Sequence, residues 1–130
     1  MATTHSATMR NTLATAVLTA IDGGAGASKL VFRLTGTVAA PGTAVATLVA
    51  SDPAGTVTGA VLTWSAITSD TNAAGNASAV AAATIQTSAD TIVLHCAVAA
   101  SGSDINMTGG LTVGAGDTVS CSSLTYTAPV

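Results

Sequence analysis

The stretch Lys29-Leu30-Val31-Phe32-Arg33-Leu34 decides how this chain folds. In an extended chain Leu30, Phe32 and Leu34 fall on one face, and the remaining residues, two of them basic, fall on the other. Apolar residues that recur with a period of two are typical of a β-strand with one buried face. The stretch therefore predicts a half-buried strand and places the start of a β-rich region at residue 29.

Downstream of this strand, short stretches of β-branched and apolar residues alternate with clusters of Gly, Pro, Asp and Ser. This spacing predicts a mainly β fold, an antiparallel β-sandwich or jelly roll of roughly seven to nine short strands. The alanine-rich segment 73–83 also fits a helix by propensity, but its β-branched flanks favour a strand. The further segments that we expect to be strands are 44–50, 57–67 (as one strand or two, with a bulge at Gly59), 77–86, 91–99, 105–107, 111–113 and 118–127.

Upstream of the β-rich region the period changes, and an α-helix is predicted. Ser6 or Thr8 can provide the N-cap hydroxyl, and Asp22-Gly23-Gly24 provides a stop signal. The apolar stripe that we expect to be buried repeats every four residues and is widened by two alanines: Met9, Leu13, Val17 and Ile21, with Ala16 and Ala20.

The length and these signals predict one domain over residues 1–130. Its parts are an extended arm (1–5), one N-terminal helix (6–22), a Gly-rich linker (23–28) and a β-domain (29–130). The apolar run 13–21 looks partly like a signal peptide, but threonines interrupt it, so a helix is the preferred interpretation. No apolar run reaches the roughly 18 residues of a membrane span, so no membrane association is expected.

The composition argues against several classes of function. Charged residues make up 7% of the chain, aromatic residues 2%, and the formal net charge is −3. The three basic residues, Arg10, Lys29 and Arg33, are too few to follow a phosphate backbone, so nucleic acid is not an expected partner. So little charge also leaves an isolated monomer poorly solvated, which suggests that neighbouring subunits cover much of the surface. The composition predicts a structural subunit.

Groups able to perform chemistry are few and scattered. His95 and Cys96 are adjacent in an expected strand and should point to opposite faces, so they cannot form a dyad; a pair of His95 with Cys121 is the weaker alternative. We expect Cys96 and Cys121 to be reduced and buried, because the chain has no convincing export signal. Each of the six aspartates falls in a turn, where its carboxylate can cap backbone N–H groups: Asp22, Asp52, Asp70, Asp90, Asp104 and Asp117.

One stretch begins like a calcium-binding loop. Residues 104–109, Asp-Ile-Asn-Met-Thr-Gly, match the start of that pattern, but Ala115 stands where the bidentate carboxylate is required. No metal, cofactor or catalytic site is therefore expected, and the sequence does not predict an enzyme.

Three stretches together resemble small virion proteins of tailed bacteriophages and prophages. These are His5-Ser6-Ala7-Thr8-Met9-Arg10-Asn11 before the helix, Ile67-Thr68-Ser69-Asp70-Thr71-Asn72-Ala73-Ala74-Gly75 in the central loop, and Val119-Ser120-Cys121-Ser122-Ser123-Leu124-Thr125-Tyr126-Thr127-Ala128-Pro129 at the end. Among such proteins the chain is most similar to head decoration, or cement, proteins.

This resemblance implies a protein made in the bacterial cytoplasm that binds the outside of a capsid and stabilises the junctions between capsomers. Its expected partners are the major capsid protein and other copies of itself, as a dimer or trimer. The alternatives are a tail, neck or fibre component of the virion, and an exported bacterial surface or adhesin module. The residues that we expect to reach a neighbour are those of the arm and the first helical turns: Met1, Ala2, Thr3, Thr4, His5 and Arg10.

Overall fold

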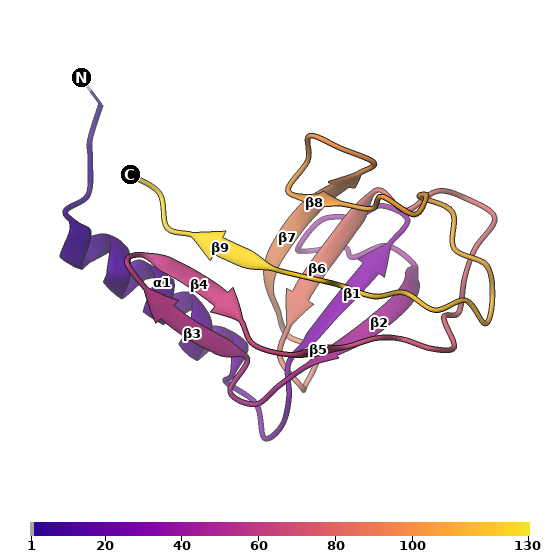
Figure 1. The fold of residues 1–130 in the computed structure, drawn as a ribbon, viewed down its shortest axis with the longest axis horizontal. Helices are drawn as coiled ribbons and strands as arrows, with labels where there is room; N and C mark the ends of the chain where they lie inside the picture. Colours follow the sequence, from indigo (N-terminus) through magenta and orange to yellow (C-terminus); the bar gives the residue numbers. More distant parts are fainter. Residues whose placement is uncertain (1) are drawn as a thin grey trace.

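The computed structural model describes residues 2–130, so the expectation for Met1 lies outside the described residues. The fold is mainly β, as predicted: one N-terminal helix is followed by nine strands in two sheets (Figure 1). The elements are α1 (Ala7–Ile21), β1 (Lys29–Arg33), β2 (Ala44–Ala50), β3 (Gly55–Thr58), β4 (Val61–Trp64), β5 (Ile67–Thr68), β6 (Ala82–Gln86), β7 (Ile92–Ala99), β8 (Ile105–Asn106) and β9 (Thr125–Thr127).

The larger sheet has six strands in the order β5-β2-β1-β6-β7-β8 and curls into a half-barrel (Figure 1). All of its neighbouring pairs are antiparallel except β7 and β8, which run parallel, so the sheet is mixed. The smaller sheet, β3-β4-β9, lies against α1. The prediction of a purely antiparallel sandwich or jelly roll is therefore too specific, because the sheet gains a parallel edge where the chain returns beside β7.

The strand that opens the β-rich region occupies the middle of the larger sheet, between β2 and β6. Leu30 lies opposite Leu48 on one side and Ile85 on the other, and all three are at most 3% exposed. Phe32, the next residue on the same face, is also 3% exposed. The alternation read from residues 29–34 therefore predicts the core face of the sheet correctly, although Val31 on the opposite face is buried as well.

The helix forms where it was predicted, with Ser6 as its N-cap: the Ser6 Oγ accepts a hydrogen bond of 3.2 Å from the Met9 N–H. Its buried side is rotated from the predicted stripe. Ala14 and Ile21 are fully buried, whereas Met9 is 44% exposed and the predicted flanking alanines are exposed. The prediction for Met9, Ala16 and Ala20 was wrong. The side chains of α1 that pack on the β3–β4 hairpin recur at intervals of three and four residues, not at every fourth residue.

The last part of the chain pairs with its middle part over a long distance. Running antiparallel, residues 111–128 exchange backbone hydrogen bonds with residues 60–80, from Val80–Leu111 at one end to Ala60–Ala128 at the other. Only β4 and β9 are regular in this ribbon, and a single bridge joins Asp70 to Val119 in both directions, at 3.0 and 2.8 Å. The ribbon anchors residues 111–128 across the half-barrel.

Several strand boundaries differ from the predicted ones, because most of this ribbon is held by single hydrogen bonds and not by a regular ladder. Segment 77–86 is a strand only from Ala82, segment 118–127 is a strand only from Thr125, and 111–113 forms no strand. Segment 57–67 is divided among β3, β4 and β5. Gly59 is not a bulge but half of a two-residue hairpin turn with Ala60, and both residues have positive φ, at 58° and 70°.

Candidate functional site

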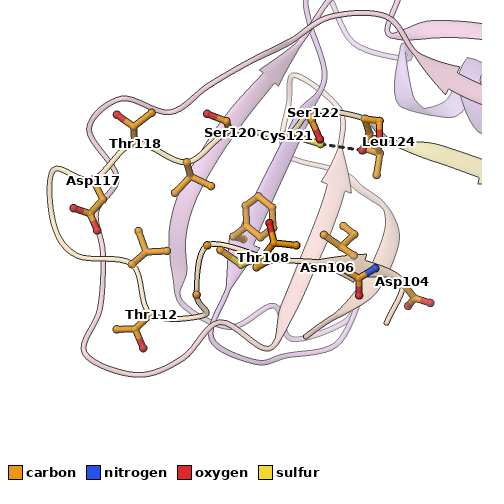
Figure 2. Close-up of a pocket in the computed structure, with 18 of the residues that line it drawn as sticks. Asp104, Asn106, Thr108, Thr112, Asp117, Thr118, Ser120, Cys121, Ser122 and Leu124 are labelled. Carbon is orange, nitrogen blue, oxygen red and sulfur yellow. Dashed lines mark hydrogen bonds between the residues drawn. The ribbon is translucent and has the colours of Figure 1, made fainter. Parts of the chain in front are cut away.

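A slot lies between two limbs of the C-terminal region (Figure 2). The first limb, residues 104–112, leaves the edge of the half-barrel at β8, and the second limb, residues 118–125, returns toward β9. A turn that contains Gly114 and Gly116 joins them. The slot has a volume of about 540 Å³, within the range of ligand-binding clefts.

The two limbs lie beside one another without pairing. In the described part of the chain, no backbone hydrogen bond joins residues 104–112 to residues 118–125. Each limb is instead hydrogen bonded on its far side: Met107 N–H donates to Ala99 O at 2.8 Å, and Val119 exchanges two bonds with Asp70. The slot is therefore a gap between two segments that are extended only in part, at residues 105–107 in the first limb and at residues 118–121 in the second.

The slot has an apolar floor and a polar rim. Along the first limb Ile105 and Met107 are half-buried, and the residues after each of them are exposed. Along the second limb Val119 and Cys121 face inward in the same alternation. The rim consists mainly of hydroxyl, amide and carboxylate groups, among them Asp104, Asn106, Thr108, Thr118, Ser120 and Ser122 (Figure 2).

The carboxylates at the slot hold the backbone of its loops. Asp104 Oδ2 accepts a hydrogen bond of 2.9 Å from the Ala97 N–H, and Asp117 Oδ2 accepts one of 2.7 Å from the Gly114 N–H. The amide oxygen of Asn106 accepts from the Ser103 N–H at 3.0 Å. The stretch that resembles a calcium loop thus uses its oxygens to cap local N–H groups, and no group of three or more His, Cys, Asp or Glu converges anywhere in residues 2–130.

The turn aspartates act as the sequence predicted in four cases. Besides the two at the slot, Asp22 accepts from the Ala54 N–H, and Asp70 accepts from the Thr47 and Asn72 N–H groups. Asp90 instead pairs with Lys29 Nζ at 2.8 Å. That hydrogen bond, with one from Gln86 and the charge of Lys29, holds the pKa of the Asp90 carboxyl below its usual range.

The predicted contact residues divide into two groups. Residues 2–5 are exposed, and none of them is hydrogen bonded to the rest of the described chain; this arm leads away from both sheets (Figure 1). Arg10 has an internal role, because its Nε and Nη2 both donate to the carbonyl oxygen of Ala128, at 3.4 and 3.2 Å. The structure does not bring the arm and the slot of one chain together: the slot loops lie toward the end of the molecule opposite the arm (Figure 1).

All three basic side chains of the described residues are engaged within the chain. Arg10 and Lys29 make the contacts just given. Arg33 lies on the outer face of the half-barrel and donates to Thr84 Oγ1 at 3.0 Å, to Gln86 Oε1 at 3.1 Å and to the carbonyl of Gly42 at 2.7 Å. The buried hydroxyl of Thr84 and the amide of Gln86 are satisfied by this network.

The candidate nucleophiles, Cys96 and Cys121, are free thiols, but their surroundings do not activate them. Cys96 pairs with Ala83 and His95 with Thr84, so His95 and Cys96 face opposite sides of β7, as predicted. Burial raises the pKa of both the Cys96 and the Cys121 thiols; for Cys96 the charge of Asp104 adds to the effect. A raised pKa keeps these thiols protonated and poorly nucleophilic at neutral pH. His95 Nε2 is buried without a hydrogen-bond partner in the described residues.

Sequence reasoning missed the slot as a site, although its two limbs were both predicted as strands. The available signal was the alternation of apolar and polar residues in two segments, 105–107 and 118–121, separated by glycines. In the part of the chain that the structure describes, no helix has the length and apolarity needed to cross a bilayer.

Comparisons with known proteins add no relative: no protein-family model matches this chain, and no curated protein or solved structure shows significant similarity to it.

Proposed function

We propose that this protein is a structural, non-catalytic virion subunit that binds the outside of a bacteriophage capsid and stabilises the junctions between its capsomers. The observation that carries the proposal is the engagement of every described basic side chain inside the chain, which leaves an exposed surface of Ser and Thr hydroxyls, small apolar side chains and a few carboxylates, with no free cation among the described residues. Such a surface suits close contacts with protein neighbours. It does not suit a polyanion.

The arrangement of the fold supports the same role. On this proposal the curled sheet and the β3-β4-β9 sheet act together as a β-sandwich left open at the slot. The uncharged arm extends from a helix that Arg10 fixes to the body, so the arm can contact a neighbouring subunit of the particle. Many equivalent weak contacts around a shell produce a high overall affinity without any charge.

The test uses purified protein and shells of the phage whose genome carries the gene. We expect binding to expanded mature shells and not to compact procapsids, because a rigid surface that touches several capsid subunits depends on their spacing. Binding should persist in molar salt, since it depends on apolar and backbone contacts. Particles that lack the protein should burst at a lower temperature.

Two outcomes contradict this proposal. If particles without the protein keep full heat resistance but fail to attach tails or to adsorb to cells, the protein is a tail, neck or fibre component. If the protein is found outside the host cell, unattached to particles and with Cys96 bonded to Cys121, it is a surface module.

A further inference from the structure

We infer that the slot accepts an extended strand, and that this strand is the N-terminal arm of a second copy of the chain. On this inference the slot takes the place of one more strand, at the edge of the half-barrel beside β8. Its two sides, residues 104–112 and 118–125, are each paired on the outside and unpaired on the inside. This inference concerns self-association in solution and does not depend on the proposed virion role.

The backbone of the second limb is arranged to receive a strand. Val119 uses both of its backbone groups to bond Asp70. In an extended chain, successive residues direct their N–H and C=O groups to opposite sides, so those of Thr118 and Ser120 are directed into the slot. The exposed, buried, exposed sequence of residues 118–120 confirms that the limb is extended there.

The first limb presents the same arrangement from the other side. Met107 bonds Ala99 on β7, and Ala99 lies opposite Asn106, so the backbone groups of Asn106 are directed away from β7 before the chain turns at residues 108–109. Four side chains pack against the core but have no strand above them, so they are only half-buried: Ile105, Met107, Cys121 and Leu124. An inserted strand would pair with both edges and cover this floor.

The arm has the properties of the missing strand. Residues 2–5, Ala-Thr-Thr-His, are exposed, lie outside any helix or strand and make no hydrogen bond within the described chain. Three of the four side chains are small, and threonine favours strands. The slot carries the carboxylates of Asp104 and Asp117, and the arm has no acidic residue that these carboxylates would repel.

The arm must come from another copy. Four extended residues span at most about 14 Å, whereas α1, with its 15 residues, is about 22 Å long and separates the arm from the half-barrel. The slot loops also lie toward the opposite end of the molecule (Figure 1). Each copy would therefore donate one arm and accept another, which closes a small ring such as a dimer or trimer.

The first test measures the oligomeric state of the full chain by sedimentation, beside two variants. Deletion of residues 2–5 removes the donor strand and spares the Ser6 cap and Arg10. Gly109→Leu fills the acceptor: a Cβ at Gly109 meets no atom within 4 Å and the residue has no positive φ, so the fold tolerates the side chain. Ala39→Leu, on the exposed tip between β1 and β2, is the matched control.

We expect an oligomer for the full chain and for Ala39→Leu, and monomers for both other variants, with circular dichroism unchanged in all four proteins. The second test places one thiol in the arm with Thr4→Cys and one on the exposed rim of the slot with Ser122→Cys, with both native thiols replaced by Cys96→Ala and Cys121→Ala. A short bis-maleimide should then link residue 4 of one chain to residue 122 of another, as peptide mapping would report. A monomeric full chain, or an oligomer that survives the deletion of residues 2–5, overturns the inference.

Discussion

The guanidinium group of Arg10 donates two hydrogen bonds to the carbonyl oxygen of Ala128, at 3.4 Å from Nε and 3.2 Å from Nη2, across 118 residues of sequence. This contact fixes the first turns of α1 to the residue that follows β9. Ala128 is only 1% exposed and donates its own N–H to Ala60. Arg10 therefore joins the two ends of the chain at the β3–β4 hairpin.

Arg10→Ala should lower the free energy of unfolding by about 1.5–3 kcal/mol, the usual effect of removing a hydrogen bond made by a charged group. Urea denaturation monitored by circular dichroism would measure the change. Met9→Ala, which truncates an exposed neighbour, is the control and should have little effect. Equal stability of Arg10→Ala and wild type would show that this contact is not significant in solution.

The rotated stripe of α1 gives a second prediction. Leu13→Asp places a charge on the half-buried side that packs near Ala14 and Ala60, so it should destabilise the protein by roughly 2–4 kcal/mol. Met9→Asp places the same charge on the exposed side and should change stability by less than about 0.5 kcal/mol. Melting temperatures of the two variants compare the two sides of the helix. Similar losses for both would restore the stripe predicted from sequence.

Asp70 provides a third prediction, because its carboxylate holds the central loop against β2. Oδ2 accepts from the Thr47 N–H at 2.8 Å and Oδ1 from the Asn72 N–H at 3.0 Å. Asp70→Ala should cost about 1–3 kcal/mol, since two N–H groups lose their acceptor. Asp52→Ala is the matched control, because Asp52 is exposed and accepts no hydrogen bond among the described residues. If the two variants unfold at the same denaturant concentration, the clamp contributes nothing.

Local patterns in the sequence were sufficient for α1 and β1. The Ser6 cap and the alternation of residues 29–34 each depend on near neighbours, and the structure confirms both. The ribbon between residues 60–80 and 111–128 could not be predicted in the same way. Its pairings join residues far apart in sequence, often through one hydrogen bond at a time, and they leave no periodic pattern.

The slot could not be predicted from the sequence for a similar reason. The alternation around Met107 and Val119 predicts extended chain in both places, but it cannot show that the two segments lie beside each other unpaired. The arm was predicted as a contact element from its position alone. Arg10 was grouped with the arm because the carbonyl of Ala128 is distant in sequence and carries no side-chain signal.

The two thiols give the final prediction, a dependence of stability on alkaline pH. The pKa values of Cys96 and Cys121 are raised in the folded protein above the ordinary value of about 8.5. The folded state therefore disfavours the thiolates more than the unfolded state does. Their contribution to stability is fully present below the unfolded pKa and is lost as pH rises through the folded pKa values.

Melting temperatures measured under reducing conditions from neutral pH to about pH 10 should therefore fall more steeply for the wild type than for a Cys96→Ala, Cys121→Ala variant. The difference between the two curves isolates the thiols from every other group that titrates in this range. Cys96 should account for more of it than Cys121, because the charge of Asp104 opposes its ionisation, whereas a hydrogen bond with Ser123 partly favours the thiolate of Cys121. Parallel curves would mean that both thiols ionise as readily in the folded chain as in the unfolded one. The apolar floor of the slot, to which Cys121 belongs, would then be open to water.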